Sequence, residues 1–143
     1  MEQPKPIQVE YRLTKIATNR FDIHADNLKD GDAEFRTELQ FAYSNNPHAV
    51  RCRMSINMVQ QGTPLMESVV DCHFEINATS IEALKQGDNV VIPAAVLIQF
   101  ASLCYGTMRG IIHTKTEGTP INRFILPPMY FHEVINQDFI AKV

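Results

Sequence analysis

The segment Val91–Ile112 constrains the fold of this chain most, because it is apolar on nearly every side. It reads VIPAAVLIQFASLCYGTMRGII, and its clearly polar side chains are Gln99, Ser102, Thr107 and Arg109. A surface helix keeps a polar face in water, whereas a helix that is apolar all round is buried on both sides. Its length also suits a membrane span, which needs roughly 20 apolar residues. The polar residues within it, Pro93 near its start and the lack of a basic flank favour a buried core helix and no membrane insertion.

Chain length, charge and cysteine content restrict the class of protein further. With 143 residues, the chain is long enough for one domain with a hydrophobic core, and we expect a single domain over residues 1–143. The net charge is −3 and the basic residues are scattered, so no nucleic-acid partner is expected. The first residues, MEQPKPIQVEY, lack the apolar run of a secretory signal. Three widely spaced cysteines are typical of free buried thiols and predict a cytoplasmic protein: Cys52, Cys72 and Cys104.

Alternating apolar and polar residues predict four β-strands in the first 78 residues. A break near residues 16–19 predicts a bulge in the first strand, whose apolar face starts with Ile7, Val9, Tyr11 and Leu13. Three further strands are expected over residues 35–43, 50–58 and 66–76, joined by turns at SNNP and QQGTP.

The parity of these strands predicts an antiparallel meander with one apolar face. The register expected across SNNP sets Val50 opposite Phe41, and the register expected across QQGTP sets Cys52 opposite Phe74. Both registers keep the apolar residues on one face and bring opposite charges together on the other. Each such cross-strand pair contributes roughly 0.2–1 kcal/mol.

The second half of the chain predicts helices. Ser80 is expected to cap a short helix that ends at Leu84, and the long apolar helix follows with Pro93 in its first turn. Residues 123–128 (RFILPP) must be extended, because a residue before proline avoids the helical region. A last helix is expected over Met129–Ala141. We therefore predict an α+β fold: a four-stranded antiparallel β-meander with the long helix and a C-terminal helix packed on one face.

This arrangement leaves part of the long helix without a cover. One stripe of the helix covers the sheet, and the last helix is too short to cover the rest. The expected cover is the same helix of a second copy. We therefore predict an obligate homo-oligomer, whose interface resembles a protein core.

No pattern in the sequence indicates catalysis. It contains no nucleotide-binding loop, nucleophile elbow or metal-site cysteine spacing. Asp71, His73 and Glu75 alternate along one strand and could gather a metal, but a hydrated strand face is the preferred interpretation. We therefore expect a protein that is not an enzyme and that has no cofactor or metal.

An excess of adaptable apolar residues indicates binding instead. Methionine suits surfaces that accept varied partners, and this chain has many, with core filling as the alternative: Met54, Met58, Met66, Met108 and Met129. The segment RFILPPMYF (residues 123–131) concentrates apolar residues around two prolines. It could wall an apolar groove or strap the core.

A recognisable order of motifs runs from Val91 to Ile135. A long helix starts at a proline and continues to Arg109-Gly110, a loop contains Gly118–Pro120, and an extended segment ends in Leu126-Pro127-Pro128. In this order the sequence resembles the SecB family of protein-export chaperones. The resemblance implies a cytosolic tetramer, a dimer of dimers with long helices between sheets. It also implies a holdase that binds unfolded or non-native polypeptides, including preproteins for Sec-dependent export, without nucleotide or metal.

The resemblance supports polypeptide binding better than contact with the export ATPase SecA. SecB proteins commonly carry an acidic sheet face and a tail that engage SecA. Here the chain ends at Val143, soon after the last expected helix, and the outward sheet face mixes both charges. Some SecB-like proteins serve toxin–antitoxin partners, which gives an alternative client.

The groove that would hold a client is expected near the loop and the last helix. Its candidate residues are aromatic or apolar: Tyr43, Leu65, Met66, Tyr105, Met108, Phe124, Leu126, Met129 and Tyr130. Two other functions stay open. One is a small-ligand-binding protein or enzyme with a pocket between sheet and helix, and the other is an assembly scaffold with one fixed partner.

Overall fold

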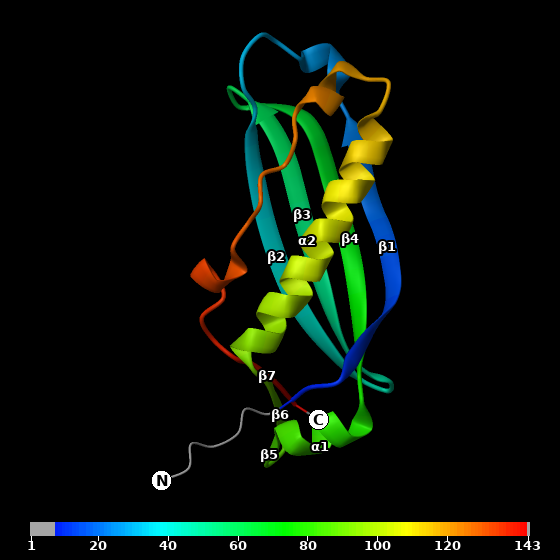
Figure 1. The fold of residues 1–143 in the computed structure, drawn as a ribbon, viewed down its shortest axis with the longest axis vertical. Helices are drawn as coiled ribbons and strands as arrows, with labels where there is room; N and C mark the ends of the chain where they lie inside the picture. Colours follow the sequence, from blue (N-terminus) through cyan, green and yellow to red (C-terminus); the bar gives the residue numbers. More distant parts are fainter. Residues whose placement is uncertain (1–7, 143) are drawn as a thin grey trace.

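The computed structural model describes residues 8–142, so that Ile7 of the predicted first strand lies outside the described residues. A long helix lies across one face of a four-stranded antiparallel sheet (Figure 1). The sheet consists of β1 (Tyr11–Ile23), β2 (Glu34–Asn45), β3 (His48–Gln60) and β4 (Thr63–Ile76). The elements that follow are α1 (Ala78–Leu84), β5 (Lys85–Gln86), β6 (Asn89–Ile92), α2 (Ala94–Thr116) and β7 (Phe139–Lys142). The predicted α+β fold is confirmed.

The strand order is β1-β4-β3-β2, which makes β1 and β2 the two edges of the sheet. Strands β2, β3 and β4 form the predicted meander through two tight hairpins. Strand β1 instead pairs with the other side of β4. A connection that contains the 3-10 turn Ala25–Asn27 carries the chain across one end of the sheet (Figure 1).

The strands are paired two positions away from the predicted register. Phe41 lies opposite Cys52 rather than Val50, and Phe74 lies opposite Val50 rather than Cys52. Each hairpin turn takes only two residues, fewer than the SNNP and QQGTP segments. In the β3–β4 hairpin an irregularity between Met58 and Val59 shifts the register once more, so that the net offset is even in both hairpins. An even offset preserves the parity of both strands. The predicted apolar face is therefore right although the partners are wrong.

Strand β1 contains two irregularities. Its register against β4 shifts between Leu13 and Lys15 and again between Thr18 and Arg20. The second shift lies at the break predicted near residues 16–19. Two shifts within thirteen residues change which side chains face the helix, so the simple alternation from Val9 onward does not continue along the strand.

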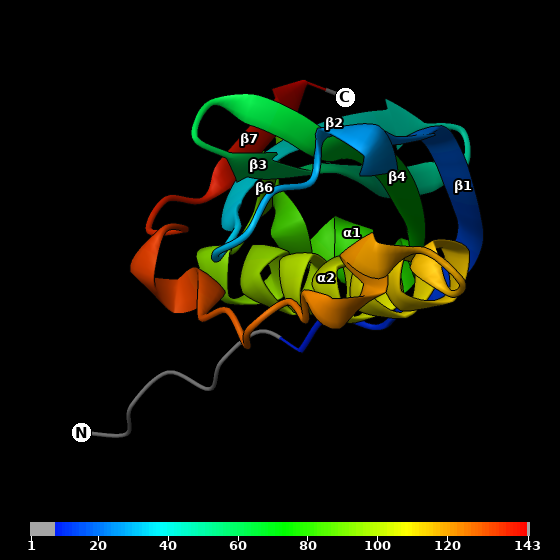
Figure 2. The same ribbon diagram turned by 90° about the horizontal axis from the view of Figure 1, so that it is seen from above.

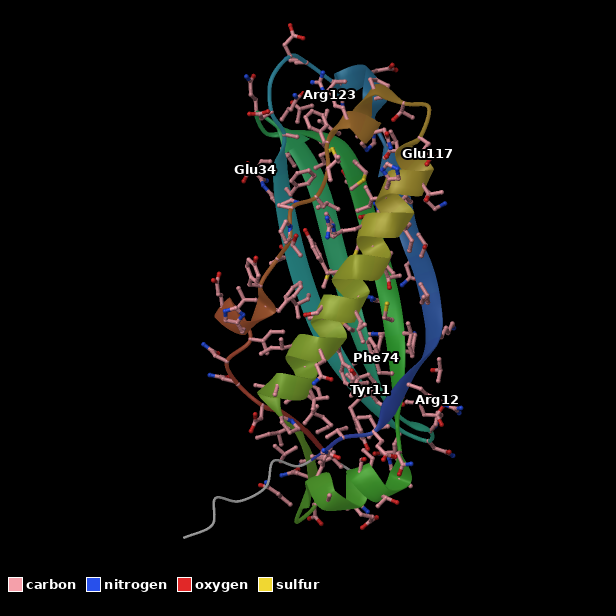
Figure 3. All side chains as sticks on the ribbon, viewed as in Figure 1. Tyr11, Arg12, Glu34, Phe74, Glu117 and Arg123 are labelled. Carbon is pink, nitrogen blue, oxygen red and sulfur yellow. The ribbon has the colours of Figure 1, made fainter. Side chains whose placement is uncertain are left out.

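Helix α2 packs an apolar stripe on the sheet and completes the core. Its buried residues are Val96, Leu97, Phe100, Ala101, Cys104, Tyr105, Met108, Ile112 and Thr116. The Phe100 ring stacks on Phe74 with 4.2 Å between centroids, and Tyr11 meets both rings edge-on. Figure 3 labels Tyr11 and Phe74, which lie near each other in the lower half of the view. The Tyr11 hydroxyl also donates a hydrogen bond to Oε1 of Gln99 at 2.7 Å. This cluster joins the edge strand β1 to the start of α2.

The long helix begins later than predicted. Val91 belongs to strand β6, and Pro93 is the N-cap residue of α2 rather than part of its first turn. The backbone N–H of Ala94 donates to Oδ1 of Asp138 at 2.8 Å. A carboxylate at a helix N-terminus satisfies a free N–H group and interacts favourably with the helix dipole. The start of α2 thus depends on a residue near the other end of the chain.

The short helix α1, in contrast, starts earlier than predicted. Asn77 rather than Ser80 is its N-cap, because the Asn77 side chain accepts a hydrogen bond from Thr79 N at 2.8 Å. Ser80 lies inside the helix and its hydroxyl accepts a hydrogen bond from Glu10 N at 2.9 Å. The serine therefore ties the segment before β1 to α1.

The C-terminal helix predicted over Met129–Ala141 is wrong. These residues form one 3-10 turn at Phe131–Glu133, an irregular link and strand β7. Strand β7 pairs antiparallel with β6, and β5 completes a small three-stranded sheet. Over so short a stretch the spacing of apolar residues fits a helix and a strand about equally. Pairing with β6 decides in favour of a strand.

Candidate functional site

Residues 124–135, which we call the strap, run back along the flank of α2 toward the small sheet (Figure 1). The Tyr105 hydroxyl donates to the carbonyl oxygen of Pro127 at 2.5 Å. The Tyr105 ring meets Phe131 edge-on, with 5.7 Å between centroids. Burial raises the pKa of Tyr105, so its hydroxyl stays protonated and remains a donor. Together with the buried Leu126, these contacts fix the strap to the helix.

The exposed surface of the strap is mainly apolar, with His132 and Glu133 as its polar part. The side chain of Ile125 is 73% exposed and that of Tyr130 is 62% exposed. Next to Ile125 a hollow of about 310 Å³ opens between the strap and α2, with Gly110 and Phe124 in its wall. Exposed apolar side chains that gather at a hollow typically mark a binding surface.

Strand β2 offers a second apolar surface at the edge of the sheet. Its inward row is half-buried and packs against the core with Phe35, Leu39, Phe41 and Tyr43. Among the strands of residues 8–142, β2 pairs with β3 alone, so its other backbone edge can receive an added strand. Figures 1 and 2 place the strap and β2 on the same side of α2, with β1 on the opposite side.

The structure divides the predicted groove residues into two groups. Five are buried within the chain: Leu65, Met66, Tyr105, Met108 and Leu126. The other four contribute to the surface: Tyr43 on β2, and Phe124, Met129 and Tyr130 on the strap. The buried residues belong to the core on which this surface packs, and Tyr105, for example, contacts Pro127 and Phe131 of the strap. Five surface residues were not among the predicted ones: Ile125 and Val134 on the strap, and Phe35, Leu39 and Phe41 on β2. Those on β2 were missed because the sequence does not reveal which strand is an edge.

The outward face of α2 explains why this helix is apolar on nearly every side. From Ala95 to Gly110 its exposed residues, apart from the charged Arg109, are small, weakly polar or apolar: Ala95, Gln99, Ser102, Leu103, Gly106 and Gly110. The last turns of the helix also expose His113, Thr114 and Lys115. Leu13 and Ile16 of the edge strand β1 are also exposed. By length and composition alone α2 could cross a membrane, yet 44% of its most apolar window is buried in this fold. One face of the helix is thus core, and the other is open in the single chain.

The outer face of the sheet, opposite α2, carries mixed charges. Arg53 donates from Nε and Nη2 to the two carboxylate oxygens of Asp71, each at 2.8 Å. Asn19 donates to the same carboxylate at 2.7 Å. The hydrogen bonds from Arg53 hold the pKa of Asp71 below its ordinary value. No group of three His, Cys, Asp or Glu residues suited to a metal occurs in residues 8–142.

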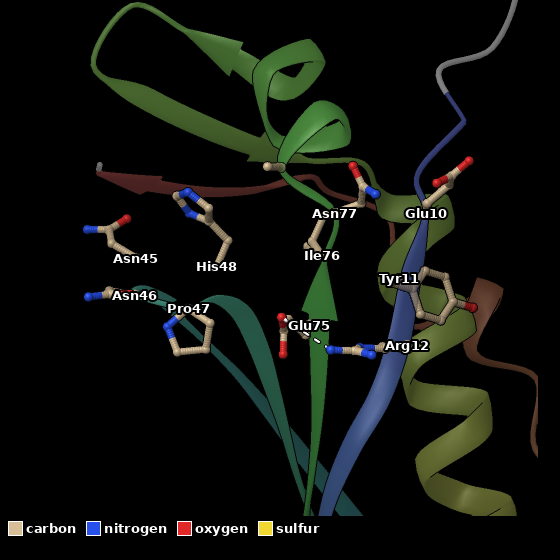
Figure 4. Close-up of a pocket in the computed structure, with 11 residues that line it drawn as sticks. Glu10, Tyr11, Arg12, Asn45, Asn46, Pro47, His48, Glu75, Ile76 and Asn77 are labelled. Carbon is tan, nitrogen blue, oxygen red and sulfur yellow. Dashed lines mark ion pairs between the residues drawn. The ribbon is translucent and has the colours of Figure 1, made fainter.

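A polar cleft of about 610 Å³ lies at the end of the sheet, beside the β2–β3 turn and the start of α1 (Figure 4). Arg12 and Glu75 form an ion pair across it at 3.7 Å. Asn77, which also lines the cleft, is engaged as the cap of α1. Its lining residues contain no nucleophile beside a base, and the cleft is not the pocket between sheet and helix that the small-ligand hypothesis required.

Comparison with known proteins gives one informative result. No protein-family model matches the chain, and no curated protein matches it by sequence. Among solved structures, it is similar to the Mycobacterium tuberculosis SecB-like chaperone Rv1957, solved in complex with a ChAD peptide from the antitoxin Rv1956 HigA1. The TM-score is 0.53 with 12% sequence identity, over 83% of this chain and 90% of the other. The resemblance found in the sequence is therefore confirmed for the fold: this chain has the SecB-like fold.

Proposed function

We propose that this protein is a SecB-like chaperone that holds unfolded or non-native polypeptides. The observation that carries the proposal is the exposed apolar strap, with Ile125 and Tyr130 on its outward side, beside the free edge of β2. An unfolded chain exposes apolar side chains and unpaired backbone groups. The strap can bury the former and β2 can pair with the latter. Affinity would come mainly from buried apolar area, at about 25 cal/mol per Å² before the cost of ordering the client.

We also propose that the protein works as a homo-oligomer, a tetramer built as a dimer of dimers. The open face of α2 supports this, because Leu103 together with Leu13 and Ile16 of β1 would otherwise stay in water. Gly106 and Gly110 on the same face have no atom near the place where a side chain would start, so another helix can approach closely. A second copy of α2 fits this surface in shape and polarity.

Preproteins and antitoxin segments are the two client classes that we consider. Holding either needs no nucleotide or metal and no catalytic step. The similar SecB-like chaperone was solved in complex with a peptide from an antitoxin, which supports the second class. Contact with SecA has less support, because the outer sheet face here mixes Arg53 and other cations with its carboxylates. The three free, buried cysteines fit a cytoplasmic location.

Aggregation assays test the proposal. Chemically denatured test proteins of unrelated sequence are diluted into buffer with an equimolar amount of this chain, and light scattering is followed. The native chain should suppress aggregation of several of them. The double substitution Ile125→Asp with Tyr130→Asp should reduce suppression at least threefold, since charges on the strap oppose apolar contact.

A matched control uses Ile140 of β7, which is 65% exposed but lies on the small sheet. Ile140→Asp should suppress aggregation as the native chain does. If the native chain suppresses nothing, or if Ile140→Asp fails as badly as the strap variant, strap-mediated holding is wrong.

A further inference from the structure

A row of basic residues crosses the outer face of the sheet, on the side away from the strap and α2. The register places Lys15 of β1 opposite His73 of β4, and His73 opposite Arg51 of β3. The last position of the row is Ala42 of β2. The row therefore contains two permanent positive charges and no carboxylate.

The carboxylates in the neighbouring rows already have partners. Asp71 accepts two hydrogen bonds from Arg53, and Glu75 pairs with Arg12. Within residues 8–142, neither Lys15 nor Arg51 forms a salt bridge.

Arg51 also lacks a hydrogen-bond acceptor for one of its side-chain nitrogens. Its side chain is half-buried, and its Nε is buried without a hydrogen-bond partner among the described residues. A buried donor without an acceptor costs free energy, and such groups are rare in folded proteins. An anionic group that docks on this face would pair with a guanidinium that forms no salt bridge of its own within residues 8–142.

We propose that the row Lys15–His73–Arg51 is a docking surface for an acidic peptide segment with aspartate or glutamate at alternate positions. Strands in a sheet lie about 4.8 Å apart, so Lys15 and Arg51 are about 10 Å apart at the backbone. Alternate side chains of an extended peptide lie about 7 Å apart on one face. The long, flexible arms of lysine and arginine bridge the difference, and an arginine can hold a carboxylate with two hydrogen bonds.

The surroundings of the row favour an acidic peptide over a nucleic acid. Asp71 and Glu75 flank the row, and a continuous line of phosphates would run against them. A peptide can place two carboxylates on the row and uncharged residues over its flanks.

His73 supplies a spectroscopic readout of binding at this site. Burial lowers the pKa of His73, and Lys15, Arg51 and Arg53 lower it further, while Asp71 acts in the opposite direction. A bound carboxylate beside the imidazole favours its protonated form. The pKa of His73, measured by NMR titration, should therefore rise when an acidic peptide is bound.

The test uses the full chain and a synthetic peptide with glutamate at alternate positions in a serine background. Its dissociation constant is measured by fluorescence anisotropy at low salt. The double substitution Lys15→Gln with Arg51→Gln should weaken binding at least tenfold and abolish the rise in the pKa of His73. The control Arg36→Gln removes an arginine from the same sheet face, where it lies beside Glu34 at 3.5 Å, and should change binding less than twofold.

Lys15→Gln alone provides a second variant, because Lys15 is exposed and its loss does not threaten the fold. It should weaken binding at least threefold. The proposal is overturned if the native chain does not bind the peptide, if a glutamine version of the peptide binds equally well, or if Arg36→Gln has the same effect as the double variant. A single-stranded oligonucleotide that binds more tightly than the peptide and depends on the same two residues would also overturn it.

The proposal for this site and the proposal for the strap can be tested independently. The strap variant Ile125→Asp with Tyr130→Asp should bind the acidic peptide as the native chain does. A loss of acidic-peptide binding in that variant would show that the two surfaces are one site, and would overturn the assignment of a separate one.

Discussion

Arg53 and Asp71 face each other on the two central strands of the sheet, and the arginine donates to both carboxylate oxygens at 2.8 Å. Asp71 is only 5% exposed, whereas Arg53 reaches solvent. A buried carboxylate is tolerated because Arg53 and Asn19 satisfy its oxygens. The pair therefore holds β3 against β4 in one register.

Replacing Asp71 with asparagine should lower the free energy of unfolding by about 1.5–3 kcal/mol, the range typical of hydrogen bonds to charged groups. Urea unfolding at neutral pH measures the change. The matched control is Asp22→Asn, which removes the exposed carboxylate that pairs with Arg20. The control should cost less than about 1 kcal/mol. Equal losses in the two variants would contradict the role given to the buried pair.

The same pair predicts how stability depends on pH. The hydrogen bonds from Arg53 lower the pKa of Asp71 in the folded protein below its ordinary value of 3.8. The resulting stabilisation is present above that ordinary value and is lost as the pH falls through the lowered one. The difference in unfolding free energy between the native chain and Asp71→Asn should therefore shrink as the solution is acidified below pH 3.8. A difference that grew on acidification would refute this assignment.

Removing the hydroxyl of Tyr105 should loosen the strap. Tyr105→Phe keeps the ring contact with Phe131 but loses the hydrogen bond to the Pro127 carbonyl. We expect a loss of about 1 kcal/mol in unfolding free energy, with faster hydrogen exchange in residues 124–135 than elsewhere. Tyr130→Phe is the control, because the Tyr130 side chain is exposed on the strap. Uniform acceleration over the whole chain would indicate general destabilisation instead.

The buried thiols should be unreactive in the folded protein. The contact with the Cys104 thiol and burial raise the pKa of Cys72, and the pKa of Cys104 is also raised, chiefly by its contact with Cys52. Only a thiolate attacks a disulfide reagent. At pH 8 a reagent such as DTNB should label no cysteine until urea unfolds the chain, and should then label three. Rapid labelling of the native protein would show that the core opens locally.

A charge on the open face of α2 should dissociate the proposed oligomer. Leu103→Glu places a carboxylate where a second helix would pack, and mass in dilute solution, measured by light scattering, should fall toward that of one chain. Ile140→Glu, at an exposed site on β7, should leave the mass unchanged. If the native chain is already a monomer with the same circular dichroism, the proposed oligomer is wrong.

Much of this architecture could be predicted from local pattern. Alternation along residues 50–58 fixed which side chains of β3 face the helix, because a strand turns successive side chains to opposite sides. The all-round apolar character of residues 91–112 predicted a long helix, and its second cover stays a prediction. The partners across each hairpin were wrong by two positions, because the pattern determines parity and the turn determines register. The candidate site was predicted only in part: residues 123–128 were correctly expected to be extended, whereas residues 129–135 were wrongly expected to be helical and the edge position of β2 was not foreseen.

The sequence by itself determined the apolar faces of β2, β3 and β4, the long helix and the extended segment before Pro127, since each depends on neighbours within a few residues. Tertiary structure alone decided that residues 139–142 pair with β6 as a strand, that Asp138 caps α2, and that β1 lies beside β4. It also left Ile125 in solvent while burying Leu126, the next residue along the chain. The physical reason is that hydrogen-bond partners and burial are set by segments distant in the chain, whose approach no local pattern encodes.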